Sequence, residues 1–265
     1  MNQGLHPRQS ISLSQRVRPW LLVIAGLIVL ATFLPPVLTL TRRYEWAEIL
    51  RYSLWAVVVP SLFVLGAPWK SFPRAAMLAA DRSRHPDSPR TFGVMFLYAL
   101  VVIFWFTPAS VRAAWGNSWL GLIEALTLIT AGTLLWLELV TSPPLVPRSG
   151  HLRRVVLGAL VMWLLWIEAY LVGMSQSGWY GFYLHTAPQT MSQAADQQVA
   201  AIVLWLVATA AFVPCIFRNA LSWLQSEQDP DSDLRRLVKE DRRGASALIA
   251  RREEESRSVS SDPLG

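Results

Sequence analysis

The chain of 265 residues is 53% hydrophobic, contains 13 tryptophans and carries a formal net charge of +6 at pH 7. Six long apolar runs account for this composition and exclude an ordinary soluble protein. The basic residues lie beside those runs, where Lys and Arg meet anionic lipid headgroups. We therefore expect a lipid bilayer as a partner and no nucleic acid.

Each apolar run is long enough to cross the hydrocarbon core of a bilayer, which needs about 20 residues of helix. Helices satisfy their own backbone polar groups in lipid. We predict an all-α, polytopic membrane helix bundle with six transmembrane helices. The predicted spans are residues 20–40, 46–67, 91–108, 118–141, 155–174 and 197–217. The first run has no clear signal-peptide cleavage site, so we expect it to be retained.

The basic residues are sorted between alternate connections. Of the 24 Lys and Arg residues, 20 lie in the N-terminal arm, the second and fourth connections and the tail. The positive-inside rule places these segments, and so both termini, in the cytoplasm. We predict a multi-pass protein of the cell inner (plasma) membrane. Its parts are an N-terminal arm (1–18), a six-helix domain (19–218) and a charged tail (219–265).

Ionisable side chains inside a span are costly in lipid and mark candidate functional sites. At about 1.5 Å per residue, several lie in the outer third of the predicted bilayer. This layer could bind a cation, relay protons, or form a structural network that includes a Glu48–Arg51 ion pair and bridges from Gln197 and Gln198. Glu138, near the cytoplasmic end, is expected to snorkel to the headgroups. The candidate polar layer is Glu48, Arg51, Tyr52, Glu124, Glu168, Asp196 and Gln197.

The outer connection between the last two spans is rich in aromatic residues and contains His185 and Met191. Imidazole and thioether groups suit copper, so this loop could cover a metal site formed by His185, Glu124 and Asp196. The alternative is an aromatic segment that lies flat at the membrane interface.

Enzyme templates are missing from the sequence, which has no Walker motif, GxSxG or HExxH. We expect a protein that is not an enzyme. A transporter remains open, because interrupted helices are typical of that class. Pro35, Pro36 and Pro60 are expected to provide such breaks.

Several motifs occur in an order that resembles one known family. The stretch from Val59 to Pro68 resembles the "aPpLLvLGaP" motif of the CtaG-type polytopic cytochrome c oxidase assembly factors. Residues 105–108 resemble the family's W-H-x-P, and Glu124 aligns with the Glu of its H-x-x-E-H. Residues 179–183 and 196–198 resemble its Tyr-rich loop and D-Q motif. The similarity covers about residues 34–217. The chain begins at what would be the family's second helix, so we expect one N-terminal span fewer.

The resemblance implies a membrane factor, or chaperone, for haem-copper oxidase assembly, and its finer implication is the maturation of a metal centre on the outer face. It implies oxidase subunits as partners. It leaves the cofactor open: the family's histidines could bind copper or haem, and copper is doubtful here because this chain lacks those histidines. Carboxylates and a single imidazole are poor Cu(I) ligands, which argues against direct copper delivery. The alternatives are a small transporter or ion-permeation protein, or a structural membrane subunit. Where the family has histidines, this chain has Glu48, Tyr52, Phe106, Gly121 and Ala125.

Overall fold

The computed structural model describes residues 17–71, 90–175, 179–185 and 191–227, and in these ranges every regular element is a helix. Contacts divide the chain into residues 1–219 and 220–265, and the description below concerns the first unit. The elements are α1 (Arg18–Thr32), α2 (Pro35–Thr41), α3 (Glu45–Ser53), η1 (Leu54–Val58), α4 (Val59–Gly66), η2 (Pro68–Ser71), α6 (Arg90–Phe106), α7 (Pro108–Gly116), α8 (Ser118–Leu139), α9 (His151–Met174), η3 (Gly181–His185) and α10 (Gln193–Glu227).

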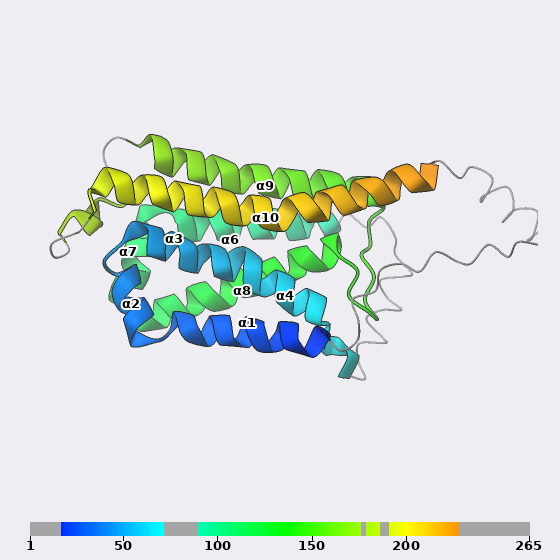
Figure 1. Ribbon diagram of the computed structural model, residues 1–265, viewed down its shortest axis with the longest axis horizontal. Coiled ribbons are helices and arrows are strands. Elements are labelled where there is room, and N and C mark those ends of the chain that lie inside the picture. Colours follow the sequence, from blue (N-terminus) through cyan, green and yellow to red (C-terminus); the bar gives the residue numbers. More distant parts are fainter. Residues whose placement is uncertain (1–16, 72–89, 176–178, 186–190, 228–265) are drawn as a thin grey trace, which may run out of the picture. The chain divides into compact units, whose positions relative to one another are not determined.

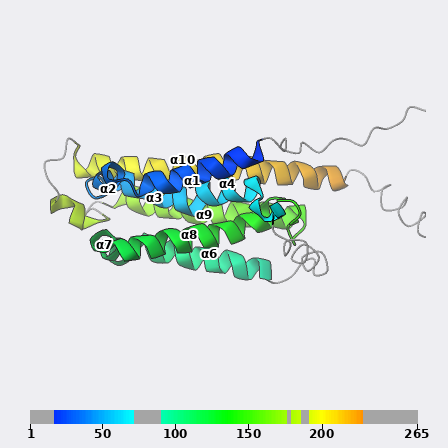
Figure 2. The same ribbon diagram turned by 90° about the horizontal axis from the view of Figure 1, so that it is seen from below.

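Four continuous helices are long and apolar enough to cross a bilayer, and they comprise Glu45–Gly66, Ser118–Leu139, His151–Met174 and Gln193–Gln225. Two bent pairs, α1 with α2 and α6 with α7, raise the number to six if each pair is one span. The predicted all-α class is confirmed for the described residues, which contain four to six candidate membrane spans against the six predicted. The long helices run side by side in both views (Figures 1 and 2).

Prolines produce the two bends, which measure 66° between α1 and α2 and 68° between α6 and α7. Leu34 and Thr107 each precede a proline and are extended, with ψ of 140° and 143°. The proline ring disfavours a helical conformation in the residue before it, whereas proline itself fits the first turn of a new helix. The expected break at Pro35 and Pro36 is confirmed, whereas the bend at Thr107, at the end of the predicted span 91–108, was not predicted.

The predicted break at Pro60 was wrong, because α3, η1 and α4 form one continuous helix. Pro60 has no N–H to donate to the carbonyl of Ala56, one turn earlier. A widened turn accommodates it: the N–H of Val59 donates to the carbonyl of Leu54, five residues back. The Tyr98 hydroxyl donates to the Ala56 carbonyl at 3.4 Å, so the freed acceptor has a donor.

The bundle has two ends of different chemistry. At the first, α2 and α7 lie close to the start of α3 (Figures 1 and 2). We call this the α2/α7 end. We call the opposite end the basic end. There the Asn219 side chain donates a hydrogen bond to the carbonyl of Leu139 and is hydrogen-bonded to the His151 ring. Arg148 and Glu138 form an ion pair there at 3.6 Å.

Candidate functional site

All seven residues of the predicted polar layer are buried in the bundle, none more than 8% exposed. They come from four helices: α3, α8, α9 and α10. Glu48 lies in the first turn of α3 and Asp196 in the first turn of α10, so the layer lies towards the α2/α7 end. Helix–helix contacts inside a membrane commonly use such polar groups, since lipid offers them no hydrogen bonds.

Arg51 is the cation of the layer. Its guanidinium contacts Glu48 Oε1 at 2.5 Å and Glu124 Oε2 at 3.9 Å, and it stacks over the Trp55 ring at 4.8 Å from the centroid. The predicted Glu48–Arg51 pair is therefore present, and Glu124 from α8 joins it. The contact between Arg51 and Glu124 holds α3 against α8. Separating the two helices, or removing Arg51, would leave a buried carboxylate without its cation.

Tyr52 and Glu168 form a second polar contact. The Tyr52 hydroxyl lies 3.0 Å from the carbonyl oxygen of Val102 and 3.2 Å from Glu168 Oε2. These atoms come from α3, α6 and α9, so three helices meet at one phenol. The contact belongs to the predicted layer, but its partner on α6 is a backbone carbonyl that no sequence pattern marks.

Asp196 binds the start of α3. Its carboxylate accepts hydrogen bonds from the backbone N–H groups of Glu45 at 2.8 Å and of Trp46 at 3.1 Å. The sequence prediction missed Glu45, because the span was expected to begin at Trp46. Glu45 is fully buried, and neither of its carboxyl oxygens has a hydrogen-bond partner among the described residues. Its position one turn before Glu48 was the available signal.

Gln197 ties the end of α9 to the connection that follows. Its side-chain amide donates to the carbonyls of Val172 and Ser175, and its oxygen accepts from the backbone N–H of Trp179. Gln198 is exposed and makes no hydrogen bond within the described ranges, so the expected bridge from Gln198 was wrong.

The connection between α9 and α10, residues 175–192, is the aromatic loop. Two of its tyrosines cover the polar layer. Tyr180 donates to the carbonyl of Phe106 at 2.9 Å, and Tyr183 donates to the carbonyl of Thr41 at 2.7 Å. Both rings are buried, which contradicts an interfacial segment lying flat on the membrane. Burial raises the pKa of Tyr180 well above its usual range, and Glu45, Glu168, Glu48 and Glu124 raise it further. The two hydrogen bonds attach this loop to the end of α6 and to the end of α2.

Glu138 does not snorkel. It is 1% exposed, accepts a hydrogen bond from Thr91 at 3.2 Å and pairs with Arg148. The connection after α8 brings Arg148 back over the helix end, which supplies a protein cation in place of a headgroup.

The described residues do not fit a copper ion. Within them, no group of three or more His, Cys, Asp and Glu side chains is placed to hold a metal. Asp196 is engaged by two backbone amides and Glu124 by Arg51. The side chain of His185 lies outside the described residues, so its role as a ligand stays a prediction. A cavity of about 50 Å³ beside Arg51 and Gly121 is lined by a second arginine, Arg42.

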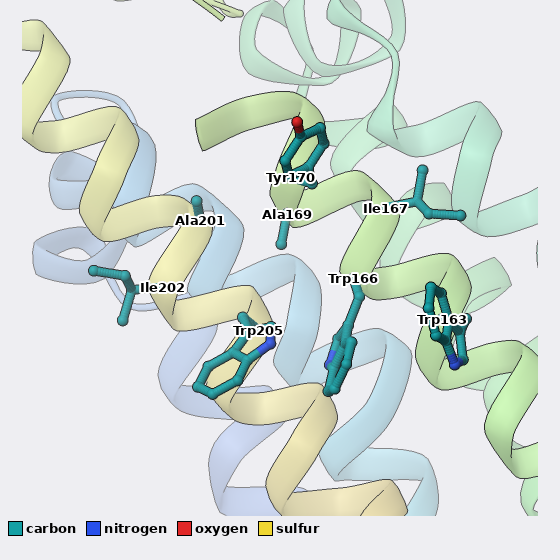
Figure 3. Close-up of a pocket in the computed structure, with 8 residues that line it drawn as sticks. All are labelled: Trp163, Trp166, Ile167, Ala169, Tyr170, Ala201, Ile202 and Trp205. Atoms are coloured by element: carbon teal, nitrogen blue, oxygen red, sulfur yellow. The ribbon is translucent and has the colours of Figure 1, made fainter. Parts of the chain in front are cut away.

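A separate groove of about 560 Å³ lies between α9 and α10 (Figure 3). Its lining is almost entirely apolar, and Trp166 and Trp205 lie beside each other in it. In a bundle this surface would face lipid chains, and it holds none of the charged groups of the polar layer. Its lining residues are Trp163, Trp166, Ile167, Ala169, Tyr170, Ala201, Ile202 and Trp205.

Comparison with known families gives a match over residues 5–226 to the cytochrome c oxidase caa3 assembly factor family. The chain belongs to this family. The comparisons of the chain with curated proteins and with solved structures found no match. The family match extends beyond the expected range at both ends.

The positions at which the family resemblance placed histidines gather in and beside the polar layer. The Tyr52 and Phe106 rings are 6.1 Å apart, and Glu48 holds Arg51. Gly121 lines the cavity next to Arg51, and Ala125 is buried. At these five positions, this family member has one carboxylate, which pairs with Arg51, two aromatic rings and two small residues.

Proposed function

We propose that this chain is a multi-pass factor of the plasma membrane that assists cytochrome c oxidase assembly without catalysing a reaction. In this proposal both bent pairs cross the bilayer, giving six spans with cytoplasmic termini. Membership of the assembly factor family supports the role. The observation that carries the proposal is the buried layer in which four helices and the aromatic loop meet at the α2/α7 end.

The side of the membrane follows from charge. Arg148 and His151 lie at the basic end, together with Asn219, and the positive-inside rule assigns that end to the cytoplasm. The α2/α7 end then faces the extracytoplasmic side. Metal centres matured on that side of an oxidase would be within reach of η3, α7 and the aromatic loop.

The layer acts in this proposal as a scaffold. Arg51 is paired with Glu48 and Glu124, and the tyrosines that cover the layer donate to backbone carbonyls, so the layer holds the surface segments α2, α7 and η3 in fixed positions. Oxidase subunits would bind that surface. Because the described donor set does not fit copper, no step of the proposal passes through a bound metal.

Deleting the gene tests the proposal. The membranes should lose haem a and CuA absorption while oxidase transcripts stay unchanged, and the wild-type gene should restore both signals. Arg51→Met should reach the membrane yet fail to restore them, because the layer no longer fixes α3 against α8. Gln198→Ala is the matched control, since Gln198 is exposed beside the layer. Unchanged oxidase spectra after deletion would contradict the proposed role.

Ion permeation is the second candidate, and the two bent helix pairs favour it because interrupted helices line transport sites. Purified protein in liposomes should pass no protons or monovalent cations if it is a scaffold. A flux that Glu124→Gln abolishes would favour permeation instead. Full complementation by both Glu124→Ala and Asp196→Ala would indicate a structural membrane subunit with no active layer.

A further inference from the structure

Glu168 has a different environment from the other carboxyls of the layer. It is 3% exposed, and no cation of the described chain pairs with it. The ionisable groups that face it are the phenols of Tyr52 on α3, Tyr98 on α6 and Tyr180 in the loop. An ionised carboxylate buried without a counter-charge is strongly disfavoured, and such a group is neutralised instead.

The number of hydrogens available at Tyr52 also indicates that the Glu168 carboxyl is protonated. The Tyr52 hydroxyl oxygen contacts two other oxygens, Glu168 Oε2 at 3.2 Å and the Val102 carbonyl oxygen at 3.0 Å. Tyr52 has one hydrogen and the carbonyl has none. Two linear hydrogen bonds therefore require a second hydrogen, and only the carboxyl can carry it.

We propose that Glu168 is a proton-binding site whose proton links α9 to α3 and α6. With the proton bound, Glu168 donates to the Tyr52 oxygen, and Tyr52 donates to the Val102 carbonyl. When the proton leaves, one hydrogen remains between three oxygens. The Tyr52 hydroxyl then turns to the carboxylate, because a charged acceptor forms the stronger hydrogen bond, and Val102 loses its side-chain donor.

The position of this contact gives the proton a structural consequence. Val102 lies one helical turn before Phe106, whose carbonyl accepts the hydrogen bond from Tyr180. The 68° bend into α7 follows directly at Thr107. The proton on Glu168 therefore determines whether α3 is bonded to α6 just before the bend. The proton-binding site does not depend on the proposed oxidase role, because it is a property of the purified protein.

Infrared spectroscopy of the full chain in lipid nanodiscs tests the proposal at neutral pH. Protein labelled with ¹³C in its glutamate carboxyls separates glutamate bands from aspartate bands. The wild-type spectrum minus that of Glu168→Gln should contain one carbonyl band of a protonated glutamic acid. Glu48→Gln is the matched control: Glu48 accepts from Arg51, so that difference spectrum should contain carboxylate bands. Carboxylate bands alone in the Glu168→Gln difference spectrum would overturn the proposal.

A second variant keeps the test decisive if Glu168→Gln does not fold. Tyr52→Phe removes the hydroxyl that accepts from Glu168 and retains the ring. The protonated-glutamate band should move to higher frequency, because the carboxyl loses its hydrogen-bond acceptor. A wild-type spectrum without such a band, or a band that Tyr52→Phe leaves in place, would refute the link between Glu168 and Tyr52.

Discussion

The carboxylate of Asp196 caps the helix that begins at Glu45, 151 residues earlier in the chain, by accepting the Glu45 N–H at 2.8 Å. A helix start leaves its first N–H groups without partners, and a side chain just before the helix usually accepts one of them. Tyr44 precedes α3 and makes no such bond. The acceptor comes instead from α10, so capping and tertiary packing are one interaction.

Replacing Asp196 should therefore destabilise the whole bundle. Asp196→Ala removes both acceptors at the start of α3 and should lower the free energy of unfolding by about 1–2 kcal/mol, the usual value of a cap. Asp196→Asn retains one acceptor oxygen and should lose less. Denaturant titration of the purified protein in detergent micelles measures both. Gln198→Ala, two residues away, should match the wild type; equal losses for Gln198→Ala and Asp196→Ala would contradict the cap.

Arg51 should be among the most sensitive positions. Arg51→Met leaves Glu48 and Glu124 buried without a cation and should cost about 3–5 kcal/mol of unfolding free energy. Adding Glu48→Gln should recover part of this loss, because one of the two stranded charges is removed. A double-mutant cycle over these two residues measures the recovery. Arg43→Met at an exposed position is the control. Strictly additive losses would show that Glu48 and Arg51 do not interact.

The close approach of α8 to the Pro60 turn predicts a large effect from one methyl group. A Cβ at Gly132 would lie 2.6 Å from the Ala56 carbonyl oxygen and 2.6 Å from Pro60 Cγ. Gly132→Ala should therefore destabilise the protein by about 1–3 kcal/mol, as overpacking does. Gly26→Ala in α1 meets no atom within 4 Å and should be neutral or stabilising. Comparing the two unfolding midpoints tests this, and a stable Gly132→Ala variant would be the contrary result.

Cysteine labelling in intact cells tests the proposed orientation. In a Cys215→Ala background, Asn117→Cys should react with an impermeant maleimide added outside the cells. Val146→Cys, at the opposite end, should react only after permeabilisation. Both native side chains are exposed, so burial does not limit either reaction. The reverse labelling pattern would place the polar layer towards the cytoplasm and remove the basis of the proposed outer-face role.

The residues of the polar layer could be predicted from the sequence, but most of their partners could not. Glu48 and Arg51 are three residues apart on one helix, so their ion pair follows from helical geometry alone. Glu124 and Glu168 stand out because charge is rare in an apolar span. Their partners are another matter: Glu124 contacts Arg51 and Glu168 contacts Tyr52, and those pairings depend on how α8 and α9 pack against α3.

By itself, the sequence determined the class of protein. A bilayer-length apolar run has few alternatives to a helix, and the sorted arginines predict the sidedness, because both properties depend on local composition. The sequence also indicated the break at Pro35, but the tertiary structure alone decided that Pro108 begins a new helix at a sharp bend whereas Pro60 stays within one. The reason is that the Pro60 turn has neighbours: Tyr98 supplies a donor to Ala56, and Gly132 leaves room for the widened backbone.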